Sequence, residues 1–159
     1  MLRKEKANVK AIMTEASEKF ITPITVQTLT NNPVYRYIFS DISKGSVEHI
    51  QLANWCDVFV IAPATAHTIG KIACGISDDL LSAVVSALPE KVPVIIAPAM
   101  NTNMWKNPMV QENIKKLRSI SKRYIFVKPK IGRLACGDIG EGALAEIEDI
   151  LSVIEKCLG

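Results

Sequence analysis

Short apolar runs that end at a proline alternate with longer amphipathic stretches along this chain. The clearest runs are residues 57–62 and 92–97, which stop at Pro63 and Pro98. A run this short and this continuously apolar is typical of a strand buried on both faces, as in a parallel sheet. Residues 8–13, with half-buried alternation, and residues 124–127 predict two further strands.

Between these runs, apolar residues recur at helical spacing. Val47, Ile50 and Ala53 predict a helix over residues 46–55. Asp78 and Asp79 favour the start of another helix because acidic side chains complement the helix dipole. The other predicted helical segments are residues 17–20, 25–30, 65–73, 78–88, 108–117 and 144–157, while the glycine-rich residues 128–143 predict a loop.

Strand, loop and helix therefore alternate, which indicates an open α/β sheet with helices on both faces. Such sheets bind ligands beyond the carboxyl ends of their strands. Residues 63–68 and 98–105 leave two of the buried strands at that edge. They are the first candidates for a functional site.

Charge and cysteine usage narrow the class of protein. The net charge is +3 and the basic residues are scattered, so nothing favours a nucleic-acid partner. The four cysteines contain no C-x-x-C pair, which argues against a zinc site or a disulfide framework and favours a reducing, cytoplasmic setting. No membrane association is expected, because no apolar run approaches the roughly 20 residues that span a bilayer.

Residues 98–105 concentrate two amides, two methionines and a tryptophan in one strand-to-helix loop. Taken alone, an Asn here either caps the next helix or binds a planar carboxylate beside methionines that line a flat ligand. The octamer resembles the P-x-M-N-x-x-M-W motif of the flavin-dependent cysteine decarboxylases. The resemblance implies that Asn101 and Met104 contact the substrate, with Asn101 on its carboxylate, and that Ala99 and Met100 contact FMN.

His49 lies in a predicted helix shortly before a buried strand. A lone His on a helix is more often a surface or a satisfied core residue. Its H-I-x-L context, however, resembles that of the catalytic His of the same family. The resemblance implies a proton-transfer role, which imidazole suits because it titrates near neutral pH.

Small hydroxyl residues follow the strand at residues 57–62. Thr65 is either a simple helix cap or part of an anion site with the helix N–H groups. The stretch resembles the family's P-A-T-A-N-T-x-x-K-x-x-x-G-x-x-D-D-L-L segment, with His67 in place of the Asn. The resemblance implies flavin contacts by Pro63, Ala64, Thr65 and Thr68, and, after the first strand, by Thr14, Ser17 and Phe20.

The glycine-rich residues 134–146 are, on their own, a plain connecting loop or a mobile loop that folds over a ligand. They resemble the A-C-G-x-x-G-x-G-R-x-A-E flap of the phosphopantothenoylcysteine decarboxylases, with Ala143 in place of the Arg. The resemblance makes Cys136 the proton donor of the last step. It places Ala135, Gly137, Gly140 and Gly142 at the substrate.

The resemblance covers essentially the whole chain. It implies a Rossmann-like, flavodoxin-type, three-layer sheet and FMN-dependent decarboxylation of 4'-phospho-N-pantothenoylcysteine to 4'-phosphopantetheine in coenzyme A biosynthesis. It also implies a homo-oligomer, a trimer or a dodecamer built from trimers, with Trp55 and residues 101–105 as candidates for the subunit contact. A peptidyl-cysteine decarboxylase and a non-catalytic flavin-fold binding subunit are the alternatives.

A single flavoprotein domain is expected over residues 1–159. The family usually opens with a further strand and a glycine-rich loop, and this chain begins where the helix after them should end, so we expect an N-terminally truncated domain. In a doubly wound sheet the first strand lies in the middle. Its two neighbours are therefore expected to keep unpaired edges.

Overall fold

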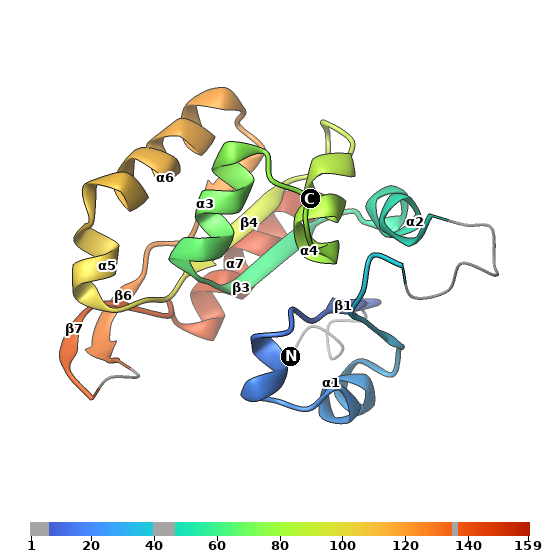
Figure 1. Ribbon diagram of the computed structural model, residues 1–159, viewed down its shortest axis with the longest axis horizontal. Helices are drawn as coiled ribbons and strands as arrows, with labels where there is room; N and C mark the ends of the chain where they lie inside the picture. The colour runs from blue at the N-terminus through green and yellow to red at the C-terminus, as the bar shows by residue number, and fades with distance from the viewer. Residues whose placement is uncertain (1–6, 40–46, 135–136) are drawn as a thin grey trace.

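Two small parallel sheets surrounded by helices form the core of the computed structural model, which describes residues 7–39, 47–134 and 137–159 (Figure 1). The larger sheet has the order β3 (Phe59–Ala64), β4 (Val94–Pro98), β5 (Tyr124–Phe126). The smaller pairs β1 (Ala11–Ile12) with β2 (Val34–Tyr35). All these pairings are parallel, so the predicted α/β class is confirmed.

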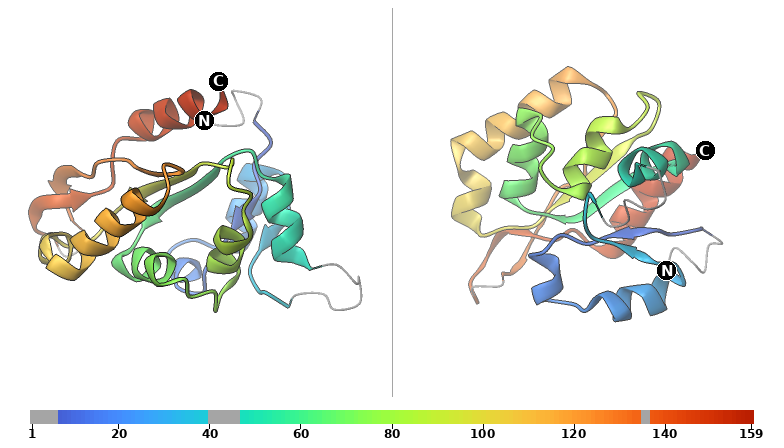
Figure 2. Two further views of the ribbon diagram at one scale, coloured as in Figure 1. Left: turned by 90° about the horizontal axis from the view of Figure 1, so that it is seen from above. Right: turned by 45° about the vertical axis from the view of Figure 1, so that its right-hand side comes forward.

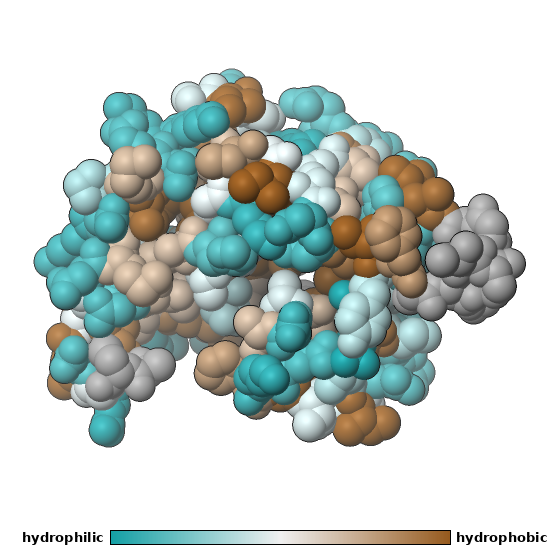
Figure 3. Space-filling model, in the orientation of Figure 1, coloured by the Kyte–Doolittle hydropathy of each residue, from teal (hydrophilic) through white to brown (hydrophobic). Residues whose placement is uncertain are grey.

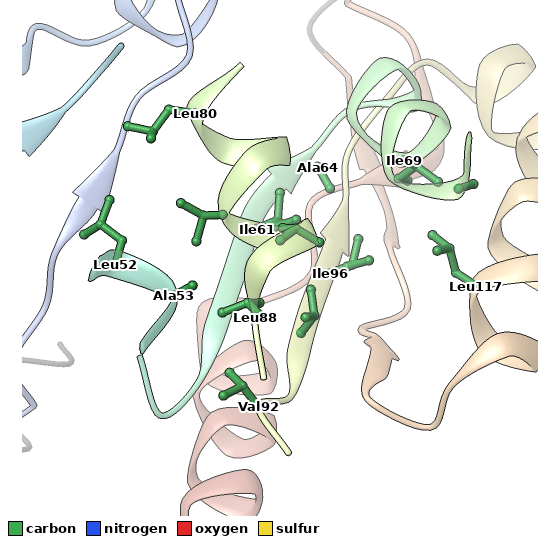
Figure 4. Packing of buried hydrophobic residues seen from close by; sticks show 14 of the residues in the cluster. Leu52, Ala53, Ile61, Ala64, Ile69, Leu80, Leu88, Val92, Ile96 and Leu117 are labelled. Carbon is green, nitrogen blue, oxygen red and sulfur yellow. The ribbon is translucent and has the colours of Figure 1, made fainter. Parts of the chain in front are cut away.

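The central strand β4 is buried along its whole length. Val94 and Ile96 pack into one apolar cluster with α3 (Ala66–Cys74), α4 (Leu80–Ala87) and α6 (Pro108–Ile120) (Figure 4). Ile95 and Ala97 point the other way, into a cluster with α7 (Ile147–Leu158). Figure 2 shows α7 alone on its side of the larger sheet. This three-layer packing explains the continuous apolar run, since each fully buried isoleucine contributes about 1.5–3 kcal/mol.

Local capping sets where the helices begin. The Thr65 hydroxyl accepts a hydrogen bond from the Thr68 amide at 3.2 Å and starts α3, which ends at Gly75 in the left-handed region. Asp79 and Ser82 form a capping box at the start of α4. The remaining helices are η1 (Ser17–Lys19), α1 (Pro23–Thr30), α2 (Glu48–Trp55) and α5 (Thr102–Lys106).

The predicted loop at residues 128–143 is wrong in part. It contains an antiparallel hairpin, β6 (Lys130–Arg133) with β7 (Ile139–Ala143). Two glycines face each other in this hairpin, Gly132 opposite Gly140, so the alternating apolar pattern that marks a strand is missing. The first strand is also shorter than predicted, and β2 and α5 were not predicted as elements.

The two parallel sheets are not joined. Within the described ranges β1 pairs with β2 and β3 pairs with β4, and no ladder connects β1 to β3. No helix in the described part of the chain is long and apolar enough to cross a membrane.

Candidate active site

The carboxyl ends of β3 and β4 meet at one edge of the larger sheet. Ala64 pairs with Pro98, and the Ala99 amide donates to the Ala64 carbonyl at 2.9 Å. The two proline-marked loops thus lie side by side, as the sequence pattern predicts. Four of the residues expected to contact flavin, Pro63, Ala64, Ala99 and Met100, come from this junction.

Asn101 is the N-cap of α5. Its Oδ1 accepts a hydrogen bond from the Asn103 amide at 2.8 Å, so the capping interpretation is correct for this oxygen. Capping fixes the orientation of the side chain, and the amide also carries Nδ2 donors, the atoms that would bind a carboxylate. The two interpretations of Asn101 are therefore compatible.

The hairpin β6–β7 docks on the Asn101 loop through two hydrogen bonds. The Met100 amide donates to the Gly142 carbonyl at 2.9 Å, and the Thr102 hydroxyl donates to the Glu141 carbonyl at 2.9 Å. A Cβ atom on Gly140 would collide with the Thr102 hydroxyl, and one on Gly142 would collide with the Met100 carbonyl. Glycine at both positions is what permits this close approach.

A groove of about 620 Å³ runs between α5 and the hairpin. It is lined by Asn101, Thr102, Asn103 and Lys106 on one wall and by Ile131 and residues 138–141 on the other. The structure therefore brings together Asn101 and Gly140, as expected. Gly142 is buried and holds the hairpin in place. Gly137 and Met104 are exposed, and neither lines the groove. Ala135 and Cys136 lie outside the described residues.

The segment after β1 forms a tight turn in which the Ser17 hydroxyl donates to the Thr14 carbonyl at 2.7 Å. Glu18 and Arg36 brace this turn, with Arg36 Nε 2.6 Å from Glu18 Oε1. The hydrogen bond from Arg36 lowers the pKa of the Glu18 carboxyl. Phe20 follows with 91% of its surface exposed.

These residues fit a flat, phosphorylated cofactor. A fully exposed phenylalanine ring is the kind of surface that a planar ring system covers. The hydroxyls of Thr65 and Thr68 stand 3.1 Å apart at the start of α3, where free N–H groups and the helix dipole favour an anion. Figure 1 shows the turn after β1 and the start of α3 on the same side of the molecule.

His49 lies in the first turn of α2, and its Nδ1 is buried without a hydrogen-bond partner in the described part of the chain. A buried, unsatisfied polar atom costs about 1–3 kcal/mol, which makes a functional role a reasonable explanation for it. Figures 1 and 2 place α2 and α5 at opposite sides of the molecule, with α3 and α4 between them. One copy of the chain therefore does not bring His49 to Asn101.

The paired acidic residues of the segment after α3 have a structural role. Lys71 Nζ lies 2.6 Å from Asp78 and 2.7 Å from Asp79. Burial would raise the pKa of the Asp79 carboxyl, but its hydrogen bonds from Lys71 and Ser82 outweigh burial and lower it. Sequence reasoning did not identify Thr102 or Lys106 as site residues, because the residues that face them across the groove lie 25 or more residues away in the chain.

No group of three or more His, Cys, Asp or Glu side chains is placed to hold a metal ion within residues 7–39, 47–134 and 137–159.

Comparison with known proteins gives consistent matches along the whole chain. The family described as Flavoprotein matches residues 1–159. A probable phosphopantothenoylcysteine decarboxylase of Streptococcus mutans is 42% identical over 151 residues, which are 95% of this chain and 83% of that protein.

Two solved structures share the fold. A PPC decarboxylase Cys-to-Ser mutant complexed with pantothenoylaminoethenethiol has a TM-score of 0.82 and 36% identity, covering 96% of this chain and 84% of its own. The FMN-dependent cysteine decarboxylase SpaF has a TM-score of 0.81 and 31% identity, covering 99% and 85%. The chain belongs to the Flavoprotein family.

Proposed function

We propose that this chain catalyses the FMN-dependent decarboxylation of 4'-phospho-N-pantothenoylcysteine to 4'-phosphopantetheine, a step of coenzyme A biosynthesis. The observation that carries the proposal is the groove in which the glycine hairpin is hydrogen-bonded to the Asn101 loop. The relatives named above, which are a phosphopantothenoylcysteine decarboxylase and two structures of cysteine decarboxylases, support the same reaction. The docked hairpin favours a phosphopantothenoyl substrate over a peptide, because the resemblance assigns this flap to the former.

FMN would be held at the carboxyl edge of the sheets. The residues proposed to hold it are Thr14, Ser17, Phe20, Pro63, Ala64, Thr65, Thr68, Ala99 and Met100. Bound there, FMN would supply a reversible two-electron exchange: it would take two electrons from the substrate's cysteine, so that the carboxylate lies β to an electron sink and CO₂ leaves easily, and it would return them to give the thiol product.

The chain's own residues would position the substrate and move protons. Asn101, oriented by its role as helix cap, would hold the carboxylate, with Met104, Ala135, Gly137, Gly140 and Gly142 forming or supporting the substrate site. His49 would accept a proton in the oxidative half of the reaction. Cys136 would return a proton to the product in the second half.

We further propose that each active site is assembled from two copies of the chain, within a homotrimer or a dodecamer of trimers. The separation of α2 from α5 supports this, because His49 and Asn101 lie at opposite sides of one copy. The exposed side chains of Ile50 and Trp55, on and at the end of α2, would be covered by a neighbouring copy. Figure 3 shows hydrophobic residues gathered in the region of α2. A single domain over residues 1–159 and a cytoplasmic location complete the proposal.

Titration of the purified chain with FMN, followed by assay of CO₂ release from phosphopantothenoylcysteine, tests the function. We expect saturable flavin binding and turnover. His49→Asn should keep its flavin and lose decarboxylation, while Gln51→Ala, an exposed position on the same helix, should behave like the natural chain. Full turnover by His49→Asn would remove this residue from the reaction.

Mixing two inactive variants tests the shared site. Equal amounts of the His49→Asn and Asn101→Ala proteins are mixed, and their subunits are dissociated and reassembled at random. If each site takes His49 and Asn101 from different copies, about a quarter of the sites in a closed ring contain both intact residues, so the mixture should regain about a quarter of the activity. If both residues of a site came from one copy, the mixture would stay inactive.

A further inference from the structure

Charge is unevenly distributed in the groove between α5 and the hairpin. Lys106 supplies the one cation among the described residues that line it, and it stands on the helix wall. Asp138 and Glu141 stand on the hairpin wall. A ligand with a second anionic group, besides the one at Asn101, would therefore be attracted to the helix wall and repelled from the hairpin.

Lys106 differs from the basic residues around it. Lys130, on the hairpin, is paired with Glu146 at 2.7 Å, and Lys71 is held between two aspartates. Lys106 makes no ion pair with any described residue and is exposed at the last position of α5. The family's Arg in the flap is Ala143 here, which is only 8% exposed, so the hairpin offers no cation at that position.

The helix α5 covers about half the length of an extended substrate with an anion at each end. Asn101 and Lys106 are five residues apart, which is roughly 7.5 Å along a helix axis. Phosphopantothenoylcysteine has about twelve covalent bonds between its carboxylate carbon and its phosphorus, the length of about four residues, so it spans roughly 13–14 Å when extended at about 3.3–3.6 Å per residue. The flexible four-carbon stem of a lysine extends the wall toward the far end of such a molecule.

We infer that Lys106 binds the phosphate of the substrate and sets the preference for the phosphorylated compound over unphosphorylated pantothenoylcysteine. The inference rests on the proposed function. Asn101 fixes the carboxylate at the start of α5, and Lys106 donates charge-assisted hydrogen bonds to the phosphate at its end. Lys106 is thus a specificity-determining residue that takes no part in the proton transfers.

The test compares two substrates that differ only in the phosphate. With the FMN-loaded enzyme, Lys106→Gln should raise KM for phosphopantothenoylcysteine about tenfold, with kcat retained, and leave KM for pantothenoylcysteine unchanged; tenfold corresponds to about 1.4 kcal/mol. Lys106→Arg should keep the preference. Lys115→Gln is the matched control, because Lys115 lies on α6 with 77% of its side chain exposed and outside the groove.

The outcomes separate this inference from the proposed function. An unchanged preference in Lys106→Gln, or an equal loss on both substrates, would overturn the role of Lys106 while leaving decarboxylation intact. Turnover of neither compound by the natural chain would overturn the proposed function instead. In that case, calorimetric titration measures the affinity of both proteins for both compounds without turnover. Equal affinity of the natural chain and Lys106→Gln for the phosphorylated compound would contradict the role of Lys106.

Discussion

Replacing Gly142 with alanine should detach the hairpin from the Asn101 loop. Gly142 has φ of +122°, a conformation that residues with a side chain rarely adopt, and an added Cβ would meet the Met100 carbonyl. The backbone conformation alone costs about 1–3 kcal/mol. Loss of the hydrogen bond from the Met100 amide adds about 0.5–1.5 kcal/mol. The total, about 1.5–4.5 kcal/mol, is comparable to the about 1–3 kcal/mol that two hydrogen bonds contribute to docking.

The cost can appear in either of two ways. If the hairpin stays docked, the whole fold is destabilised and the melting temperature falls by about 3–18 °C, at roughly 2–4 °C per kcal/mol for a chain of this size. If the hairpin swings away, the melting temperature changes little and kcat/KM for decarboxylation falls, because the groove loses one wall. Circular dichroism melting and the CO₂ assay together cover both cases.

Gly132→Ala is the matched control in the same hairpin. Its Cβ would lie 3.4 Å from the Cβ of Ala143 and 3.6 Å from a carbon of Lys130, which are ordinary van der Waals distances. We expect a change within about 0.5 kcal/mol. If Gly142→Ala matched Gly132→Ala in both melting and activity, the argument from close approach would be refuted.

Two further predictions concern titratable groups. The pKa of the Asp79 carboxyl is lowered from 3.8, so its contribution to stability should be present at neutral pH and be lost as pH falls below about 4. The variant Asp79→Ala also removes the cap of α4, at a cost of about 1–2 kcal/mol, and its stability to urea should fall less between pH 6 and pH 3 than that of the natural chain. An equal loss of stability in both proteins would contradict this prediction. Burial raises the pKa of the Cys56 thiol to about 11, so at pH 8 iodoacetamide should label Cys56 far more slowly than the exposed Cys74. Peptide mapping measures both labelling rates, and equal rates would show that Cys56 is not shielded.

The elements that the sequence predicts well are those with a strong local pattern. The run that became β4 is apolar on both faces because helices cover both, and Thr65 and Asp79 begin helices by contacts within three residues. The hairpin was missed because Gly132 opposite Gly140 gives no apolar alternation. Strands of two residues, such as β2, carry too few positions for any period to show.

The candidate site divides in the same way. Asn101 and the glycines could be named from their motifs, but their joining depends on the Thr102 hydroxyl and the Glu141 carbonyl, which are 39 residues apart. No local pattern reports a contact between residues at that separation. The distance between α2 and α5 is likewise a property of the fold, so the proposal of a site shared between copies arises only when the helices are seen in space.

The separation of the two parallel sheets has a consequence for how the molecule opens. Met13 is the one buried residue among residues 7–39, and Ile12, Tyr35 and Ile38 pack against the core only partly buried, so β1, β2 and α1 should form a cooperative unit that exchanges its amide hydrogens faster than β4. Thr14, Ser17 and Phe20 belong to that unit, whereas Thr65 and Met100 lie just after β3 and β4 of the larger sheet. A flavin that contacts both would link them, and its binding free energy would protect chiefly the weaker unit from opening.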